Sequence, residues 1–103
     1  MAKWIKVGEV GFVEPGQVKV IIPRPEVRIA LANVDGEHYA IDDVCTHDGG
    51  PLDQGEVIGD QIECPRHGAR FDVRTGKAMT LPAIFPVKTY PVKVEDKDIL
   101  IEL

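Results

Sequence analysis

Short apolar runs, broken at close intervals by glycine and proline, extend along the whole chain. From Val27 to Ala32 large apolar side chains alternate with arginine and alanine, which is the period of two expected of a strand. The Asp35-Gly36 pair separates this run from "HYAI", and such a pair between two strand-like runs is a strong hairpin signal. No segment has convincing helical periodicity. This part of the chain therefore predicts two antiparallel strands.

The same punctuation predicts further strands on both sides of this hairpin. A strand over 18–22 should end at "PRP", Gly59-Asp60 should turn a second hairpin, and Thr75-Gly76 should turn a third. At the C-terminus a charged turn over 95–98 joins two runs. Their expected inward-facing residues are Val92, Val94, Ile99 and Ile101, with Leu103 as a further candidate. The fold class predicted is all-β, a small antiparallel barrel or sandwich.

The length and the net charge of the chain exclude several classes of protein. With 103 residues and 44% apolar residues, the chain is expected to form a single domain over 1–103 that buries a modest core. A formal net charge of -5 argues against a nucleic-acid binder. No run approaches the length of a membrane span, and the first residues do not resemble a leader peptide. We expect a cytoplasmic protein with nothing cleaved.

The candidate chemistry lies in two short segments, "VCTHDGGPL" and "CPRHGARFD". Each contains one of the two cysteines, Cys45 and Cys64, followed closely by a histidine, His47 or His67. A disulfide would leave both histidines unexplained. A single tetrahedral zinc could use the four side chains, although the order Cys, His, Cys, His differs from the usual Cys2His2 spacing. The alternating order suits two metal atoms, with both thiolates on one iron and both imidazoles on the other.

The two segments resemble the ligand motif of the Rieske ferredoxin family, C-x-H followed by C-x-x-H, with sixteen residues between His47 and Cys64. The similarity includes "CPRHGARFDVRTGKA" and the "LPA" at 81–83, and weaker similarity extends from about residue 4 to the C-terminus. The resemblance implies a Rieske fold with a two-loop cluster-binding subdomain. It also implies one 2Fe-2S cluster per chain, held by Cys45, His47, Cys64 and His67.

High-potential relatives resemble C-T-H-x-G-C and C-P-C-H-G-S-x-Y, in which a disulfide joins the loops and a Ser and a Tyr donate hydrogen bonds to cluster sulfurs. The corresponding residues here are Gly50, Arg66, Ala69 and Phe71. Losing those hydrogen bonds lowers the potential, because they stabilise the more negative reduced state. The sequence therefore indicates the low-potential branch of the family.

The resemblance implies a soluble one-electron carrier that takes electrons from a reductase, expected to be an NAD(P)H-dependent flavoprotein, and passes them to a terminal oxygenase. We expect a monomer that docks transiently, with no catalytic residues of its own. A Rieske oxygenase would also need a mononuclear iron site, for which the third histidine, His38, is insufficient. Two alternatives remain open: the small Rieske subunit of an assimilatory nitrite reductase, and a structural zinc-binding interaction module.

Other residues have simpler interpretations. His38 is expected at the surface, and Trp4, the one tryptophan, at the edge of the core. Seven acidic residues between 42 and 63 precede the basic Arg66, Arg70, Arg74 and Lys77, which suits either a solvated surface or a docking role. A set of apolar residues is expected to shield the cluster from water: Pro51, Leu52, Leu81, Pro82 and Ala83.

Overall fold

The computed structural model describes residues 3–46, 49–81 and 83–103, and its regular structure in these ranges consists of strands alone. The all-β prediction is therefore confirmed. None of the described residues forms a helix long and apolar enough to cross a membrane. The strands are β1 (Trp4–Glu9), β2 (Val18–Arg24), β3 (Val27–Val34), β4 (Glu37–Asp42), β5 (Glu56–Ile58), β6 (Gln61–Glu63), β7 (Arg70–Asp72), β8 (Thr89–Tyr90), β9 (Val92–Glu95) and β10 (Asp98–Glu102).

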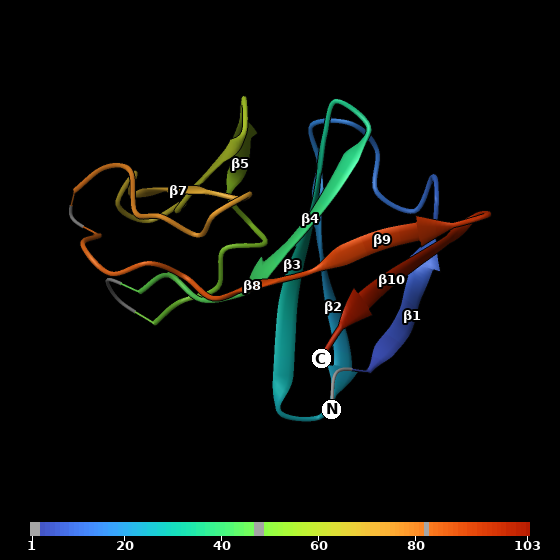
Figure 1. Cartoon of the computed structure of the whole chain (residues 1–103). Helices are drawn as coiled ribbons and strands as arrows, with labels where there is room; N and C mark the ends of the chain where they lie inside the picture. The colour runs from blue at the N-terminus through green and yellow to red at the C-terminus, as the bar shows by residue number, and fades with distance from the viewer. Residues whose placement is uncertain (1–2, 47–48, 82) are drawn as a thin grey trace.

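Two antiparallel sheets form a barrel-like body on one side of the molecule (Figure 1). One has the order β1-β10-β9 and the other the order β2-β3-β4-β8. Their facing side chains make one apolar core, to which the first sheet contributes Ile99 and Ile101 and the second contributes Ile29 and Leu31. The alternation seen along the sequence is thus the alternation between this core and the opposite face of each strand.

The central strand β3 is buried on both faces. Ile29 and Leu31 face the core of the barrel, whereas Ala30 and Ala32 belong to a second core. Its neighbour β4 divides in the same way, with Ala40 in the first core and Ile41 in the second. These two strands are therefore a wall shared by the barrel and a second lobe.

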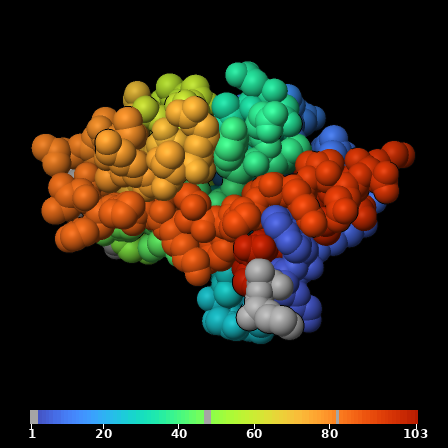
Figure 2. Space-filling model, in the orientation of Figure 1, coloured from blue at the N-terminus to red at the C-terminus, as the bar shows by residue number. Residues whose placement is uncertain are grey.

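The second lobe contains the three-stranded sheet β5-β6-β7 and the loops around it (Figure 1). In the space-filling view it lies against the barrel as a continuous body (Figure 2). Its core includes Leu52, Ile62 and Phe71, all fully buried, together with both cysteines. The cysteine-bearing loops are thus anchored in apolar packing and not merely attached to the surface.

Two turns show why glycine is needed at particular positions. Asp35 and Gly36 both have positive φ, +53° and +93°, as a two-residue hairpin turn with right-handed strand twist requires. Gly76 has a φ of +80°, and a Cβ there would lie 2.1 Å from the carbonyl oxygen of Val87. The Val87 N–H donates to Gly76 O at 2.8 Å. This close approach fixes the segment after residue 78 against the β7 hairpin.

Several details differ from the sequence-based expectations. Strand β1 was not predicted, and it pairs with β10 through an irregular register. Strand β2 continues through Pro23 to Arg24, because a register shift after Ile21 accommodates the proline that was expected to end it. Val94 is exposed, since β9 lies at the edge of its sheet. The first of these outcomes depends on pairing between the two ends of the chain, and the other two depend on how a strand sits in its sheet.

Candidate metal centre

The loop after β4 folds back on Cys45 through two backbone hydrogen bonds. The N–H of Cys45 donates to the carbonyl of Gly50 at 2.7 Å, and the N–H of Gly49 donates to the carbonyl of Cys45 at 2.7 Å. Gly49 has a φ of +77°, a conformation that glycine adopts without steric cost. The closed loop leaves the Cys45 side chain fully buried.

The loop after β6 has the same design. The N–H of Cys64 donates to the carbonyl of Ala69 at 2.7 Å, and the N–H of Gly68 donates to the carbonyl of Cys64 at 3.0 Å. Gly68 has a φ of +74°, close to that of Gly49. Cys64 is buried as deeply as Cys45. The sequence therefore produces two equivalent loops, each beginning at a buried thiol.

Neither cysteine forms a disulfide, and both belong to one buried cluster, so the disulfide interpretation is not supported. His67 is exposed on the second loop, three residues beyond Cys64. His47, the fourth expected ligand, lies outside the described residues. Within residues 3–46, 49–81 and 83–103, no three Cys, His, Asp or Glu side chains form one compact metal-binding group. A two-iron cluster with two protein ligands on each iron does not need such a group.

Arg66 connects the two cysteine loops at the positions where high-potential relatives have the joining disulfide, although its individual contacts were not predicted. Its Nη2 lies 3.2 Å from the Sγ of Cys64, and its Nη1 donates to the carbonyl of Pro51 at 3.1 Å. A Cβ on Gly50 would lie only 2.4 Å from the Cζ of Arg66. The guanidinium therefore lies on the backbone of the first loop while it points at the cysteine of the second.

Asp43 holds the base of the first loop from inside the molecule. Its Oδ1 accepts hydrogen bonds from the N–H groups of Leu52 at 2.8 Å and Asp53 at 2.7 Å, and its Oδ2 accepts one from Arg28 at 3.1 Å. Burial raises the pKa of Asp43, as does the neighbouring Asp53 carboxyl, while the two N–H donors lower it. The side chain thus ties the two ends of the segment 43–53 together.

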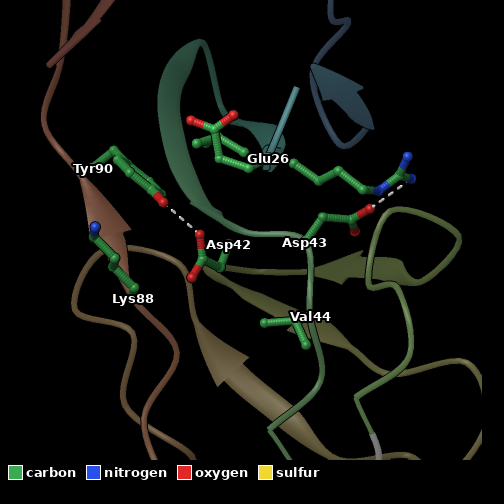
Figure 3. A pocket seen from close by; sticks show the side chains of 8 residues that line it. Glu26, Asp42, Asp43, Val44, Lys88 and Tyr90 are labelled. Atoms are coloured by element: carbon green, nitrogen blue, oxygen red, sulfur yellow. Dashed lines mark hydrogen bonds and ion pairs between the residues drawn. The ribbon is translucent and has the colours of Figure 1, made fainter. Parts of the chain in front are cut away.

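A shallow pocket lies beside Asp43, lined in part by Asp42, Lys88 and Tyr90 (Figure 3). The Tyr90 hydroxyl donates to Asp42 Oδ1 at 2.5 Å. Burial of the hydroxyl, followed by its bond to Asp42, raises the pKa of Tyr90. This bond joins β8 to the end of β4, directly before the first cysteine loop. It therefore fixes the direction in which the loop leaves the sheet.

A third loop, of which residues 79–81 and 83–85 are described, contacts both cysteine loops. Thr46 Oγ1 donates to the carbonyl of Phe85 at 2.7 Å, and Thr80 Oγ1 donates to the carbonyl of Gly68 at 3.4 Å while it accepts from the N–H of Arg70 at 2.9 Å. Three of its large apolar side chains are exposed, Leu81 at 77%, Ile84 at 68% and Phe85 at 65%. We call these three residues together with Met79, also exposed, the apolar rim.

Of the residues expected to shield the metal centre, Leu52 and Ala83 are buried as predicted. The prediction for Leu81 is wrong, because its side chain faces solvent. Pro51 is also exposed, and Pro82 lies outside the described residues. His38 was expected at the surface but is half-buried, with its Nε2 enclosed and without a hydrogen-bond partner. Desolvation lowers the pKa of His38.

The donor chemistry fits a 2Fe-2S cluster. Two buried thiols in equivalent loops could provide sulfur ligands, and the apolar core behind them includes Leu52 and Phe71. An imidazole on the exposed side of one loop could provide a nitrogen donor. The Rieske [2Fe-2S] domain family model matches residues 3–91. The chain belongs to this family. Its cofactor is therefore a 2Fe-2S cluster, and the zinc alternative is not retained.

Proteins of known function that resemble this Rieske chain are ferredoxin components of dioxygenase systems. The ferredoxin component of the naphthalene 1,2-dioxygenase system of Pseudomonas putida is 41% identical over 101 residues, covering 98% of this chain and 96% of the relative. The 3-phenylpropionate/cinnamic acid dioxygenase ferredoxin subunit of Shigella boydii is 51% identical over 76 residues, covering 73% and 72%.

Solved structures agree with the Rieske fold that the sequence predicted. The Sphingomonas yanoikuyae B1 ferredoxin has a TM-score of 0.91 and 37% identity, covering 98% of this chain and 99% of that one. The ferredoxin in a complex with the oxygenase of carbazole 1,9a-dioxygenase has a TM-score of 0.90 and 32% identity, with coverages of 95% and 91%. A Mycobacterium tuberculosis protein described as a nitrite reductase small subunit has a TM-score of 0.88 at 19% identity, which shows the fold alone.

Proposed function

We propose that the protein is a one-electron carrier, a Rieske ferredoxin that passes electrons from a reductase to a terminal oxygenase. Cys45 and Cys64 would hold one iron of the 2Fe-2S cluster, and His47 and His67 the other. The observation that carries the proposal is the pair of equivalent loops, each presenting one buried cysteine to the same core without a disulfide between them. The relatives among dioxygenase ferredoxins support it.

The bound cluster would supply a site that gains and loses one electron. The surrounding protein determines from which side a redox partner can approach this site. The two cysteine side chains lie on the buried side of their loops, where water is excluded. His67 lies on the exposed side. We propose that the imidazoles of His47 and His67 are the exit for the electron, since a neutral imidazole ligand keeps an N–H that can point to a docked protein.

The apolar rim supports a docking site at this end of the molecule. Three exposed large side chains, Leu81, Ile84 and Phe85, lie on a loop bonded to both cysteine loops. Contiguous exposed apolar surface is typical of protein-interaction sites. We propose that a terminal oxygenase and an NAD(P)H-dependent flavoprotein reductase use this end in turn, which requires transient docking of a monomer.

Local charge pairing makes the acidic residues of the second lobe less important for docking than their number implies. Arg70 binds Glu63 at 2.9 Å, and Arg74 binds Asp60 at 2.8 Å. These pairs neutralise each other within the lobe. Part of the asymmetry seen along the sequence is thus a set of internal ion pairs, and we propose that apolar contact contributes more to partner affinity than net charge does.

Several finer expectations belong to the same proposal. We propose a soluble, cytoplasmic protein whose residues 1–103 form a single Rieske domain, with a potential at the low end of the family range. The nitrite reductase small subunit that resembles this chain is 19% identical, which supports the fold alone, whereas the two ferredoxin relatives are 41% and 51% identical. Co-purification with a large flavoprotein or sirohaem protein would favour the alternative.

Electron transfer can be tested with purified components. The oxidised protein is mixed anaerobically with NADH and a flavoprotein reductase from a dioxygenase system, and the visible absorption of the cluster is followed. We expect reduction only when the reductase is present, then reoxidation on addition of the oxidised terminal oxygenase of the naphthalene system. A cluster that dithionite reduces, but that neither component reduces or reoxidises, would contradict the carrier function.

A further inference from the structure

Arg66 makes three contacts that span the two cysteine loops. Its Nη2 is 3.2 Å from Cys64 Sγ, and its Nη1 donates to the carbonyl of Pro51 at 3.1 Å. Between these ends the guanidinium lies over Gly50, where an added Cβ would be 2.4 Å from Cζ and 2.8 Å from Nε. One side chain therefore reaches a cysteine sulfur in one loop and the backbone of the other.

Gly50 is needed here because it has no side chain that would collide with Arg66. It is not needed for an unusual backbone conformation. Its φ lies outside the left-handed region, unlike that of the neighbouring Gly49 at +77°. An alanine at position 50 could therefore adopt the same backbone, and the three atoms nearest to its Cβ would all belong to the end of the Arg66 side chain. The guanidinium of Arg66 can occupy its position because residue 50 has no side chain.

We propose that Arg66 is a positioning residue that joins the two cluster loops without a covalent bond and raises the reduction potential of the centre through Cys64 Sγ. This inference rests on the proposed function, because it assigns Arg66 a task toward the cluster that Cys64 would bind. It concerns a residue that neither the ligand motif nor the buried core includes.

The chemistry of a guanidinium explains both parts of this role. Its planar fork can donate to two acceptors at once, which an ammonium group cannot do in the same geometry. A hydrogen bond from a charged donor to a ligating sulfur becomes stronger when the centre gains negative charge. Reduction adds that charge, so Arg66 favours the reduced state. Because the same group is bonded to Pro51, it also resists separation of the loops and loss of the cluster.

The test compares three variants of the loaded protein by voltammetry and by the rate of cluster release to a chelator. Arg66→Met keeps an unbranched stem but removes charge and donors. Gly50→Ala keeps the arginine and displaces it. Arg74→Met is the matched control, since this arginine lies on the same lobe and pairs with Asp60 and Asp72.

We expect Arg66→Met to shift the reduction equilibrium about tenfold toward the oxidised state, which is about 59 mV for a one-electron couple. Gly50→Ala should shift it in the same direction by about threefold, because the donor is displaced but the charge stays nearby. In the Arg66→Met background, Gly50→Ala should have no further effect. Arg74→Met should stay within about twofold of the wild type. Both site variants should release the cluster faster.

Unchanged potential in a loaded Arg66→Met protein, or a shift equal to that of Arg74→Met, would overturn the proposal. If Arg66→Met cannot be loaded, Gly50→Ala decides, because it retains every charge: an unchanged potential there overturns the proposal as well. A wild-type protein that binds no 2Fe-2S cluster would instead contradict the proposed function itself. The two failures are therefore distinguishable.

Discussion

Cys45 and Cys64 occupy equivalent positions in two loops that close through the same pair of backbone hydrogen bonds. In each loop the cysteine N–H donates to the carbonyl five residues ahead, and the cysteine carbonyl accepts from a glycine four residues ahead, at 2.7 to 3.0 Å. The correspondence presents each thiol to the same core from opposite loops. Each loop is thereby expected to contribute equally to the metal centre.

This equivalence predicts that either cysteine is essential for the cluster and for stability. Cys45→Ser or Cys64→Ser should purify without iron, and the melting temperature should fall by at least about 4 °C, the change that 1 kcal/mol produces in a domain of this size. Iron content and thermal unfolding measure both effects. Full iron loading with an unchanged melting temperature in Cys64→Ser would show that this residue is not a ligand.

The second prediction concerns hydrogen bonds to the cluster sulfurs. Ala69 and Phe71 are buried behind Cys64, at the positions where high-potential relatives have Ser and Tyr. We expect a wild-type potential of about -150 mV, at the low end of the Rieske range. Ala69→Ser and Phe71→Tyr should each raise it by roughly 40 mV, because a donor that gains about 1 kcal/mol on reduction shifts a one-electron couple by that amount.

Protein-film voltammetry of the wild type, both single variants and the double variant at one pH tests this prediction. A wild-type potential above about +100 mV contradicts the low-potential assignment. A loaded double variant without an upward shift would mean that positions 69 and 71 do not face the sulfurs.

The third prediction concerns Asp43, which accepts two backbone N–H groups as well as Arg28. Asp43→Ala leaves the buried N–H of Leu52 without its acceptor and should cost about 2–3 kcal/mol of unfolding free energy. Arg28→Met removes the half-exposed partner of the buried Asp43 side chain but leaves both backbone donors in place, and it should cost only about 1 kcal/mol. Denaturant unfolding separates the two. Equal losses of unfolding free energy in the two variants would mean that Asp43 stabilises the protein through its ion pair and not through its hydrogen bonds to the loop backbone.

The fourth prediction tests the apolar rim as a docking site. The double variant Leu81→Ser, Ile84→Ser should lower the second-order rate of electron transfer to the terminal oxygenase about tenfold, the effect of losing about 1.4 kcal/mol of docking energy. Its potential and melting temperature should not change, because both side chains are exposed. Val10→Ser, at an exposed apolar position of the barrel, is the control. An equal decrease of the electron-transfer rate in the control would show that the apolar rim is not the docking site.

The parts of the fold and of the metal centre that the sequence predicts are those whose conformation depends on a few neighbouring residues. The Asp35-Gly36 hairpin and the two cysteine loops follow from local turn chemistry, in which particular glycines permit positive φ. The buried position of Leu52 follows from its apolar character. These features could be predicted because each is decided by the residue itself and its nearest neighbours.

What the sequence did not reveal depends on contacts between distant segments. Arg66 reaches Gly50 and Pro51 across sixteen and fifteen residues, and no local pattern specifies where a long side chain will end. Leu81 was expected inside because it is apolar, yet its loop is held by Thr46 and Thr80 with that side chain outward. Hydrogen bonds between distant segments therefore determine both the position of the Arg66 side chain and the exposure of Leu81.

The most direct test of the central claim is the composition and magnetic resonance of the purified, reduced protein. We expect two irons and two labile sulfides per chain, with an EPR signal on reduction that shows hyperfine coupling to two imidazole nitrogens, as ligation by two His and two Cys requires. His67→Ala should remove one of these couplings or the whole cluster. Stoichiometric zinc without sulfide, or a reduced cluster without nitrogen coupling, would contradict the account.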